Sequence, residues 1–544
     1  MKNITGIHIN SFQIFGSLAT ISALATCAIA DLAANITETK KPNIVFILAD
    51  DLGYGDIGCY NSGSKVPTPN LDRLAMQGMR FTDAHSPSTI STPSRYSLLT
   101  GQMAFRINYA STFPGGMGGP CLIKDNQLTL PQMLRNQGYA TFMTGKWHVG
   151  LTFFDKNGKM ITANGVEGVK MIDYTRAIPD APTHRGFDRF FGTAGCPGTA
   201  VLYAFIDGDR IPVPPTGMLD KTNLPKHPYS TDNRNGMIAP FYDLEELDMV
   251  FLKKSKEYLE DHVKMNPEKP FFLLHSTSAV HLPSFASREL KGATKAGPHG
   301  DFIFEFDYVV GELMKTLEKL GVADNTVVII SSDNGPETIA VANMRADYGH
   351  DGARPWRGMK RDNWEGGHRV PFIVVWPGKI VPGSTSDQTI CLTDVMATCA
   401  AITGSDLPGN SAEDSFNILP VMLGKDDGNP VRPYTLHQPT SLSLGIRKGS
   451  WKYLEHTGSG GNSYSRDILV PFALPEAAPT APGQLYDLSR DPGETTNLYF
   501  KYPEVVRELK ELLENSKTTG RSAPAVLKRN AIPVTEKPNK SPTK

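Results

Sequence analysis

The feature that most constrains the fold of this chain is a series of short, continuously apolar runs, each of which ends in polar residues. The runs occupy residues 43–48, 140–143, 271–274, 326–330 and 371–376. Uninterrupted apolar runs of this length are typical of strands that are buried on both faces of a parallel sheet. Between them lie helical patterns, of which the clearest is the row of apolar residues spaced three and four apart over residues 303–320. Alternating strands and helices predict an α/β domain built on a large mixed, mostly parallel, doubly wound sheet.

The pattern changes after residue 423. Residues 442–454 and 484–488 have the character of antiparallel strands joined by turns, and residues 505–513 have the spacing of an amphipathic helix. We therefore expect the main α/β domain over residues 31–425 and a smaller C-terminal α+β subdomain with an antiparallel sheet over residues 426–517. The Lys, Pro and Ser content of residues 518–544 predicts a disordered tail.

The start of the chain has the features of an export signal. Residues 14–30 are uncharged and rich in small and apolar residues, Lys2 supplies a weak positive start, and Ala28 and Ala30 form an A-x-A-like cleavage site. The stretch is short for a membrane span and diluted with Ser, Thr and Gly, so it predicts a cleaved signal peptide over residues 1–30. Anchoring as a lipoprotein through Cys27 is the less favoured alternative, because Thr26 stands where Gly or Ala is more usual. No later segment of the sequence is apolar for long enough to span a bilayer.

Composition excludes several classes of protein. Hydrophobic residues make up 40% and charged residues 20% of the chain, which excludes a mostly disordered protein. The 55 Lys and Arg residues balance 56 Asp and Glu residues, so no excess of positive charge indicates a nucleic-acid partner. Six cysteines are too few for a disulfide scaffold. Cys391 and Cys399 are expected in one helix, about 12 Å apart, which is too far for a disulfide, so we expect buried thiols.

Polar side chains follow four of the apolar runs. They are Asp50 and Asp51 after the first run, Lys146 and His148 after the second, His275 and His281 after the third, and Asp333 and Asn334 after the fourth. Open α/β sheets bind ligands outside the carboxyl ends of their strands. The sequence therefore predicts a functional site at one edge of the sheet.

The oxygen-bearing residues of this set suit a hard divalent cation. Asp50, Asp51, Asp333 and Asn334 offer the carboxylate and amide oxygens that Ca²⁺ prefers. Nothing in the sequence resembles a thiolate or clustered-histidine zinc site. Either pair alone has the alternative of an ordinary cap or turn after a strand. Together at one sheet edge, the two pairs favour a metal site.

Residues 91–101, with the sequence STPSRYSLLTG, predict a helix whose first turn can bind an anion. Pro93 suits the first turn, which places Ser91 near the helix N-terminus, where free N–H groups and the helix dipole favour negative charge. Arg95 lies one turn further on and could hold a carboxylate, phosphate or sulfate in a bidentate grip. The alternative is a plain helix start with a capping serine.

The motif S-x-P-S-R at residues 91–95, followed by LLTG, resembles the signature of the formylglycine-dependent sulfatases (type I) of the alkaline phosphatase superfamily. Further motifs of that family occur in the family's order over residues 41–500: NIVFILADD, GKWH, RGFDRFFG, PFFLLHSTSAVHLP, SSDNG, GMKRDNWEGGHRVP and LYDLSRDPGETTNL. The resemblance implies an alkaline phosphatase-like sheet sandwiched by helices.

The resemblance also implies a role for each marked residue. Ser91 would be oxidised to formylglycine (3-oxoalanine), whose hydrated form is the nucleophile, and a serine at this position implies maturation by a radical-SAM type enzyme. Asp50, Asp51, Asp333 and Asn334 would bind one Ca²⁺ together with residue 91. The remaining roles are to orient residue 91 (Arg95), to contact sulfate oxygens (Lys146 and Lys360), to take a proton from the second hydroxyl (His148) and to protonate the leaving alcohol (His281).

These residue types match what the hydrolysis of a sulfate monoester requires. The departing alkoxide is a poor leaving group unless a nearby acid protonates it, and the negative charge on the transferring group calls for a metal and fixed cations. The favoured function is an exported, periplasmic or cell-surface bacterial sulfatase that acts on sulfated glycans of galactose or hexosamine type. The alternatives are a phosphatase or phosphonate monoester hydrolase of the same superfamily, and a non-catalytic sulfated-glycan-binding protein if Ser91 is not matured.

Two further clusters could contact the substrate, although a solvated loop is the preferred interpretation of each. They are residues 180–185 and the pair His437 and Gln438. The sequence assigns no role to His368 and Arg369.

Overall fold

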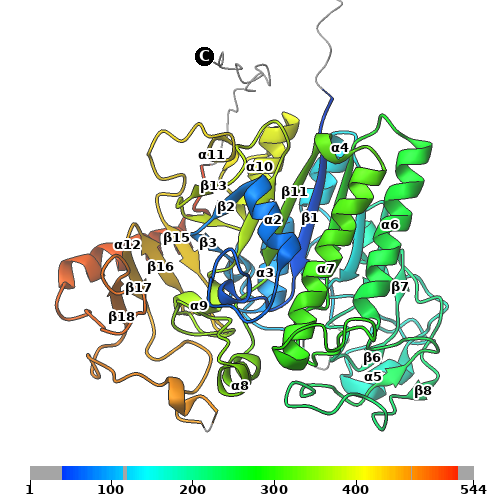
Figure 1. Ribbon diagram of the computed structural model, residues 1–544, viewed down its shortest axis with the longest axis horizontal. Helices are drawn as coiled ribbons and strands as arrows, with labels where there is room; N and C mark the ends of the chain where they lie inside the picture. Colours follow the sequence, from blue (N-terminus) through cyan, green and yellow to red (C-terminus); the bar gives the residue numbers. More distant parts are fainter. Residues whose placement is uncertain (1–39, 114–118, 467, 525–544) are drawn as a thin grey trace, which may run out of the picture. The chain divides into compact units, whose positions relative to one another are not determined.

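The computed structural model describes residues 40–113, 119–466 and 468–524 (Figure 1). The described residues from Pro42 onward form one compact unit. The predicted signal peptide at residues 1–30, with Cys27, and the part of the predicted tail beyond residue 524 lie outside the described residues. None of the helices in the described part of the chain combines the length and the apolar character that crossing a bilayer requires.

A nine-stranded sheet with the strand order β13-β2-β12-β11-β1-β10-β4-β5-β7 forms the centre of the unit. Its inner strands all run parallel: β11 (Thr326–Ser332), β1 (Asn43–Ala49), β10 (Phe271–Ser276), β4 (Ala140–Lys146) and β5 (Arg189–Thr193). The outer strands are β12 (Phe372–Val375), β2 (Met79–Phe81), β13 (Ser384–Ser386) and β7 (Ile206–Asp207). Strands β12 and β7 run antiparallel to the inner strands beside them, and β2 runs antiparallel to β12. Every residue of β1, β4, β10 and β11 is buried. The prediction of a mixed, mostly parallel sheet is confirmed.

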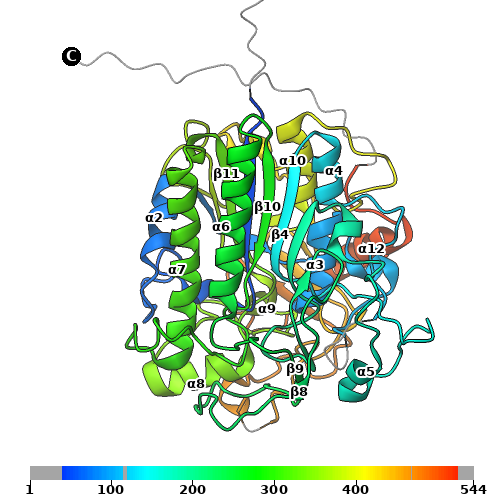
Figure 2. The same cartoon turned by 90° about the vertical axis from the view of Figure 1, so that its right-hand side faces the viewer.

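Helices cover this sheet in two groups, with β10 and β4 between them in Figure 2. One group is α2 (Pro69–Gln77), α6 (Leu247–Met265) and α7 (Gly297–Lys319), and the other is α3 (Ser91–Thr100), α4 (Leu130–Asn136) and α10 (Asp394–Thr403). The apolar row predicted at residues 303–320 lies on α7, where Ile303, Phe306 and Leu317 are fully buried. Gly321 follows the helix with a φ of +69°, a conformation that glycine adopts without steric penalty. Further α-helices of this unit are α5 (Gly165–Met171), α8 (Thr338–Tyr348), α9 (Glu365–His368) and α11 (Leu419–Met422).

A four-stranded antiparallel sheet, in the order β15-β16-β17-β18, lies late in the chain, as predicted. Its strands are β15 (Thr435–His437), β16 (Gly445–Lys448), β17 (Trp451–Leu454) and β18 (Gln484–Asp487). Helix α12 (Pro503–Thr518) packs against β16 and β17 through an apolar cluster that includes Ile446, Leu509 and Leu513. A small third sheet holds β6 (Leu202–Tyr203), β9 (Met237–Ile238) and β8 (Gly217–Met218).

The two cysteines expected in one helix lie in different elements. Cys391 is in β14 (Ile390–Cys391), which pairs with β3 (Ala84–His85), whereas Cys399 is in α10. The prediction is wrong at Cys391 because Asp394 accepts the backbone N–H of that residue, which turns the chain before the helix begins. Both thiols are free and buried, as expected.

Buried charges join the antiparallel sheet to α9. Lys452 in β17 is fully buried, and its Nζ lies 3.0 Å from Glu365 Oε1 and 2.9 Å from Glu494 Oε1. Burial acts to raise the pKa of Glu365, but Lys452 and the neighbouring basic side chains together outweigh it and hold this pKa well below its ordinary value. The ammonium therefore makes two otherwise unfavourable buried carboxylates compatible with the fold.

Substitution of Lys452 tests this junction. The variant K452A would leave the buried Glu494 without its cation and would leave Glu365 with Arg369 and Arg447, and breaking a buried pair costs about 3–5 kcal/mol. We expect a loss of that size in the free energy of unfolding, measured by urea denaturation. The variant K448A is the control, because Lys448 pairs with Glu508 on the surface, where a pair contributes about 0–1 kcal/mol. Equal losses in the two variants would contradict the role assigned to Lys452.

Candidate active site

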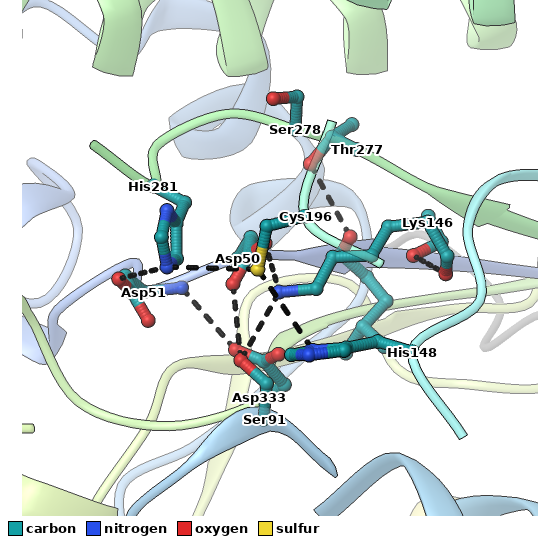
Figure 3. A network of polar contacts seen from close by, with 12 residues as sticks. Asp50, Asp51, Ser91, Lys146, His148, Cys196, Thr277, Ser278, His281 and Asp333 are labelled. Carbon is teal, nitrogen blue, oxygen red and sulfur yellow. Dashed lines mark hydrogen bonds and ion pairs between the residues drawn. The ribbon is translucent and has the colours of Figure 1, made fainter. Parts of the chain in front are cut away.

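The polar residues that follow the central strands meet at one edge of the sheet (Figure 3). Asp50 and Asp51 directly follow β1, Asp333 directly follows β11, and Lys146 is the last residue of β4. In the parallel register, the last residue of β1 pairs with the last residue of β11. The chain therefore leaves both strands at the same level, which brings their carboxylates together.

Ser91 is the first residue of α3 and is buried against these carboxylates. Its Oγ lies 3.3 Å from Asp50 Oδ1 and 3.4 Å from Asn334 Oδ1, and Lys146 Nζ donates to it at 3.2 Å. The segment before it is fixed locally, because Ser94 Oγ both donates to the Ser88 carbonyl and accepts the Ser88 N–H. The structure thus places the side chain of Ser91 between two acceptors and one cation.

Each of three buried aspartates at this edge has its own cation. The pairs are Lys146 Nζ with Asp50 Oδ2 at 2.5 Å, Arg95 Nε with Asp333 Oδ2 at 2.8 Å, and Lys360 Nζ with Asp51 Oδ2 at 2.7 Å. Burial acts to lower the pKa of Arg95, but Asp333 and Asp50 outweigh it and raise this pKa. Burial likewise acts to lower the pKa of Lys360, and the carboxylates of Asp51 and Glu337 together reverse that effect. Both side chains therefore stay charged although they are buried.

The acceptors around Ser91 outnumber the available hydrogens. Asn334 Nδ2 donates to Asp51 Oδ1 at 2.7 Å and to the Gly335 carbonyl at 2.9 Å, which leaves Asn334 Oδ1 facing Ser91. Asp50 Oδ1 faces the same hydroxyl, which carries one hydrogen for the two oxygens. A bound cation would satisfy both oxygens, and the carboxylate and amide donor set suits a hard cation such as Ca²⁺.

Two histidines lie beside these charges. His148 follows β4 with a φ of +55°, an uncommon conformation for a residue other than glycine, and burial lowers its pKa. His281 Nδ1 donates to the Leu282 carbonyl at 2.6 Å, and its Nε2 lies 3.8 Å from Asp51 Oδ2. Burial acts to lower the pKa of His281, but the negative charges at Cys196 and Asp51 raise it to about 10. Two imidazoles whose pKa values are pushed apart are suited to act as one acid and one base.

A cavity of about 510 Å³ opens onto these groups. Its buried lining includes Ser91, His148, His281 and Lys360. Its more exposed lining is largely polar and includes Thr231, Asp232, Arg234, Arg361 and Thr440. The cavity thus joins a cationic floor, suited to an anion, to a wall of hydrogen-bonding groups.

Cys196 lines the cavity although no sequence motif marked it. Cys196 follows β5 and lies within sulfur hydrogen-bond distance of both His148 and His281. Its only signal in the sequence is its position just after RGFDRFFG, one of the motifs that resemble a known family. His275, which the strand-end pattern had included, instead hydrogen-bonds Thr144 and Ser255 inside the fold and does not line the cavity.

The two clusters that could have contacted the substrate have structural contacts instead. Asp180 is buried and accepts the backbone N–H groups of Cys121 and Thr152. Gln438 is also buried, and its Oε1 accepts the backbone N–H of Phe105. The interpretation of these clusters as solvated loops is therefore wrong, and neither lines the cavity.

A second group of metal-ligand types lies elsewhere, at His85, Glu365, His368 and His437, and all of it is buried. Its geometry does not fit one ion. The rings of His368 and His437 stack 3.9 Å apart and only 12° from parallel, whereas an imidazole binds a metal through a lone pair in its own ring plane. Lys452 Nζ also lies 3.1 Å from His368 Nε2 and already occupies that side of the group with positive charge. This group therefore belongs to the buried junction around Lys452, which gives His368 a structural role.

Comparison with known proteins agrees with the sequence motifs. A family model described as Sulfatase matches residues 42–405. The N-acetylgalactosamine-6-O-sulfatase of Bacteroides thetaiotaomicron is 34% identical over 95% of this chain and 100% of its own length. Human arylsulfatase A is 33% identical over 88% of this chain and 89% of its own length.

Solved structures give the same result. A Bacteroides thetaiotaomicron structure from work on the metabolism of multiple glycosaminoglycans superposes with a TM-score of 0.74 at 33% identity, and covers 88% of this chain and 100% of that chain. The phosphonate monoester hydrolase of Agrobacterium radiobacter shares only the fold, with a TM-score of 0.54 at 16% identity over 88% of this chain and 96% of that chain. The chain therefore belongs to the sulfatase family and is a sulfuric ester hydrolase.

Proposed function

We propose that this enzyme removes O-sulfate groups from sulfated glycans of galactose or hexosamine type. The observation that carries the proposal is the cavity, in which a cationic floor beside Ser91 meets a wall of polar groups such as Asp232 and Arg234. Paired acidic and basic side chains at a cavity wall suit the hydroxyl groups of a sugar, which both donate and accept hydrogen bonds. The relative named N-acetylgalactosamine-6-O-sulfatase supports the same substrate class.

Ser91 is the proposed nucleophile position. Members of the family generally use formylglycine, and in this chain a radical-SAM type enzyme would oxidise Ser91, whose hydrated product supplies the attacking oxygen. Lys146 Nζ, 3.2 Å from Ser91 Oγ, stabilises negative charge on that oxygen and on the sulfate. The Arg95 side chain donates to Asp333, so it acts on residue 91 through the carboxylates around it.

Asp50, Asp51, Asp333 and Asn334, with residue 91, are the proposed ligands of one Ca²⁺. When bound, the ion adds positive charge beside the sulfate oxygens. Lys360 pairs with Asp51 Oδ2 at 2.7 Å, and Lys360 also lines the cavity. Together these groups oppose the charge of the transferring sulfate group.

The two histidines divide the proton transfers. The hydrogen bond from His281 Nδ1 to the Leu282 carbonyl fixes the ring, and His281 lines the cavity, where it can protonate the leaving alcohol. His148 lines the same cavity from the side of β4 and takes the proton that residue 91 releases when sulfate departs. Each histidine therefore acts in one half of the reaction.

Export is part of the proposal. Residues 14–30 have the composition and the A-x-A-like end of a cleaved signal, which would place the enzyme in the periplasm or on the cell surface of a bacterium. A sulfatase in that position meets polymeric sulfated glycans directly.

Mass spectrometry of the peptide that contains Ser91 tests the nucleophile. In protein from the native host we expect a mass lower by two hydrogen atoms, because oxidation of the serine alcohol to an aldehyde removes them. The variant S91A should lose activity by at least ~10⁴-fold with an unchanged unfolding midpoint. An unmodified serine would contradict this assignment. It would favour the phosphatase alternative if that protein hydrolyses phosphate esters, and the non-catalytic alternative if it hydrolyses no ester.

Calcium binding tests the metal ligands without any need for activity. Protein with unmodified Ser91 should show a higher unfolding midpoint when Ca²⁺ is added, since a ligand at 100 times its Kd stabilises by about 2.7 kcal/mol. The variant D51N should lose this rise, whereas D261N should keep it, because Asp261 pairs with Arg189 on the surface. A calcium-dependent rise that survives in D51N would contradict the ligand set.

Substitution of Asp232 tests the substrate class. The variant D232A should raise KM for a sulfated monosaccharide about 10-fold or more, because a hydrogen bond to a charged group contributes about 1.5–3 kcal/mol. KM for a small aryl sulfate, which has no sugar hydroxyl groups, should stay near its wild-type value. The control is D220A, since Asp220 is exposed and does not line the cavity. An equal change of KM for both substrates would argue against a sugar subsite at Asp232.

A further inference from the structure

The thiol of Cys196 lies between the two histidines of the site (Figure 3). Its Sγ is 3.9 Å from His148 Nδ1 and 3.8 Å from His281 Nε2. Because sulfur is large, both distances are within hydrogen-bonding range for a thiol or thiolate. Cys196 lines the same cavity as Ser91, so one side chain touches both proton-transfer groups and faces the substrate.

The backbone around Cys196 is held on both sides. The Ala194 carbonyl accepts the N–H of His148 at 3.0 Å, and the Tyr242 hydroxyl donates to the Pro197 carbonyl at 2.9 Å. Tyr242 is itself buried. The sulfur therefore has a fixed position, which is what a group needs if it is to orient its neighbours.

Electrostatics favour the contact. Burial acts to raise the pKa of Cys196, but Lys146 together with His148 and His281 outweighs it and lowers this pKa well below the ordinary value. The other four cysteines of the described residues have raised pKa values because they are buried: Cys59, Cys121, Cys391 and Cys399. Cys196 thus differs in chemistry from every other described thiol.

The histidines need such a partner for different reasons. The Leu282 carbonyl accepts the hydrogen of His281 Nδ1. The direction of the other ring nitrogen, Nε2, then depends on its own contact, which is with Cys196 Sγ. Cys196 Sγ is the hydrogen-bond partner of His148 Nδ1, and the partner of one ring nitrogen determines which nitrogen carries the proton. A single sulfur is therefore placed to fix one ring's direction and the other ring's tautomer.

We propose that Cys196 is a positioning residue that holds the imidazoles of His148 and His281 in the orientations in which they transfer protons. This inference rests on the proposed roles of the two histidines. Serine at this position would keep a hydrogen-bonding group. Because the bond from Cβ to oxygen is shorter than the bond to sulfur, the serine oxygen could reach one ring at most. Alanine would release both rings.

The test compares C196A, C196S and the control C59S in enzyme whose conversion at Ser91 has been verified by mass spectrometry. In C196A we expect kcat to fall about 10- to 100-fold, the size of effect that a small misplacement of a catalytic group produces, while KM changes less than about threefold. The loss should be greater for alkyl sulfates than for aryl sulfates, because a poor leaving group depends more on protonation by His281. C196S should recover part of the loss, and C59S should match the wild type.

Histidine resonances give a readout that does not depend on catalysis. In protein labelled with ¹⁵N-histidine, C196A should shift the imidazole nitrogen signals of His148 and His281, and C59S should not. Wild-type enzyme that is converted at Ser91 but hydrolyses no sulfate ester would overturn the proposed function alone, since these shifts would still report the contact. Unshifted signals in C196A, or equal losses of kcat on alkyl and aryl sulfates with a lowered unfolding midpoint, would overturn the role of Cys196.

Discussion

The site depends on the pairing of three buried aspartates with three buried cations at one edge of the sheet. Asp50, Asp51 and Asp333 are all nearly inaccessible to solvent, and unpaired carboxylates in such a position would repel one another and lose their hydration. Lys146, Lys360 and Arg95 remove that penalty, one cation for each acid. The same cations then face the place where an anionic substrate meets Ser91. The same cations therefore stabilise the fold and, in the proposed mechanism, bind the substrate. The formal net charge of −1 does not reveal this local group of positive charges.

The parallel strands make this concentration of charge feasible. β1, β11 and β4 end close to the same level, so residues far apart in the chain are delivered together without long flexible connections. Two of the delivered residues, Asp51 and His148, have positive φ values of 62° and 55°. Such conformations cost free energy and persist where surrounding contacts fix them. In this fold the contacts are those of the site itself, for example Asn334 on Asp51 and Cys196 on His148.

Much of this arrangement could be predicted from the sequence, because it depends on local patterns. The continuous apolar runs identify the central strands, and Asp50, Asp333 and Lys146 follow from where those runs end. Ser91 and Arg95 follow from the start of one helix. These inferences need no knowledge of distant contacts, since parallel strands bring their carboxyl ends together whatever the details of packing.

What could not be predicted depends on contacts between distant segments. Asp180 and Gln438 are polar residues whose partners, the backbone N–H groups of Thr152 and Phe105, are fixed only by the tertiary structure. The sequence predicts a helix at Cys391, where the structure has a strand, because a short apolar segment fits strand and helix equally. Cys196 stands in a loop without a periodic pattern, and its position between two histidines follows from the packing of that loop against β4.

The central claim is that an oxygen supplied by residue 91 attacks sulfur while His281 protonates the departing alcohol. Hydrolysis of a sulfated sugar in water enriched in oxygen-18 tests it directly. If sulfur is attacked, the bond between sulfur and the bridging oxygen breaks, so over many turnovers the label enters the sulfate and the sugar keeps its original oxygen. Label in the sugar hydroxyl would mean that carbon is attacked instead, and would contradict the proposed roles of Ser91 and His281.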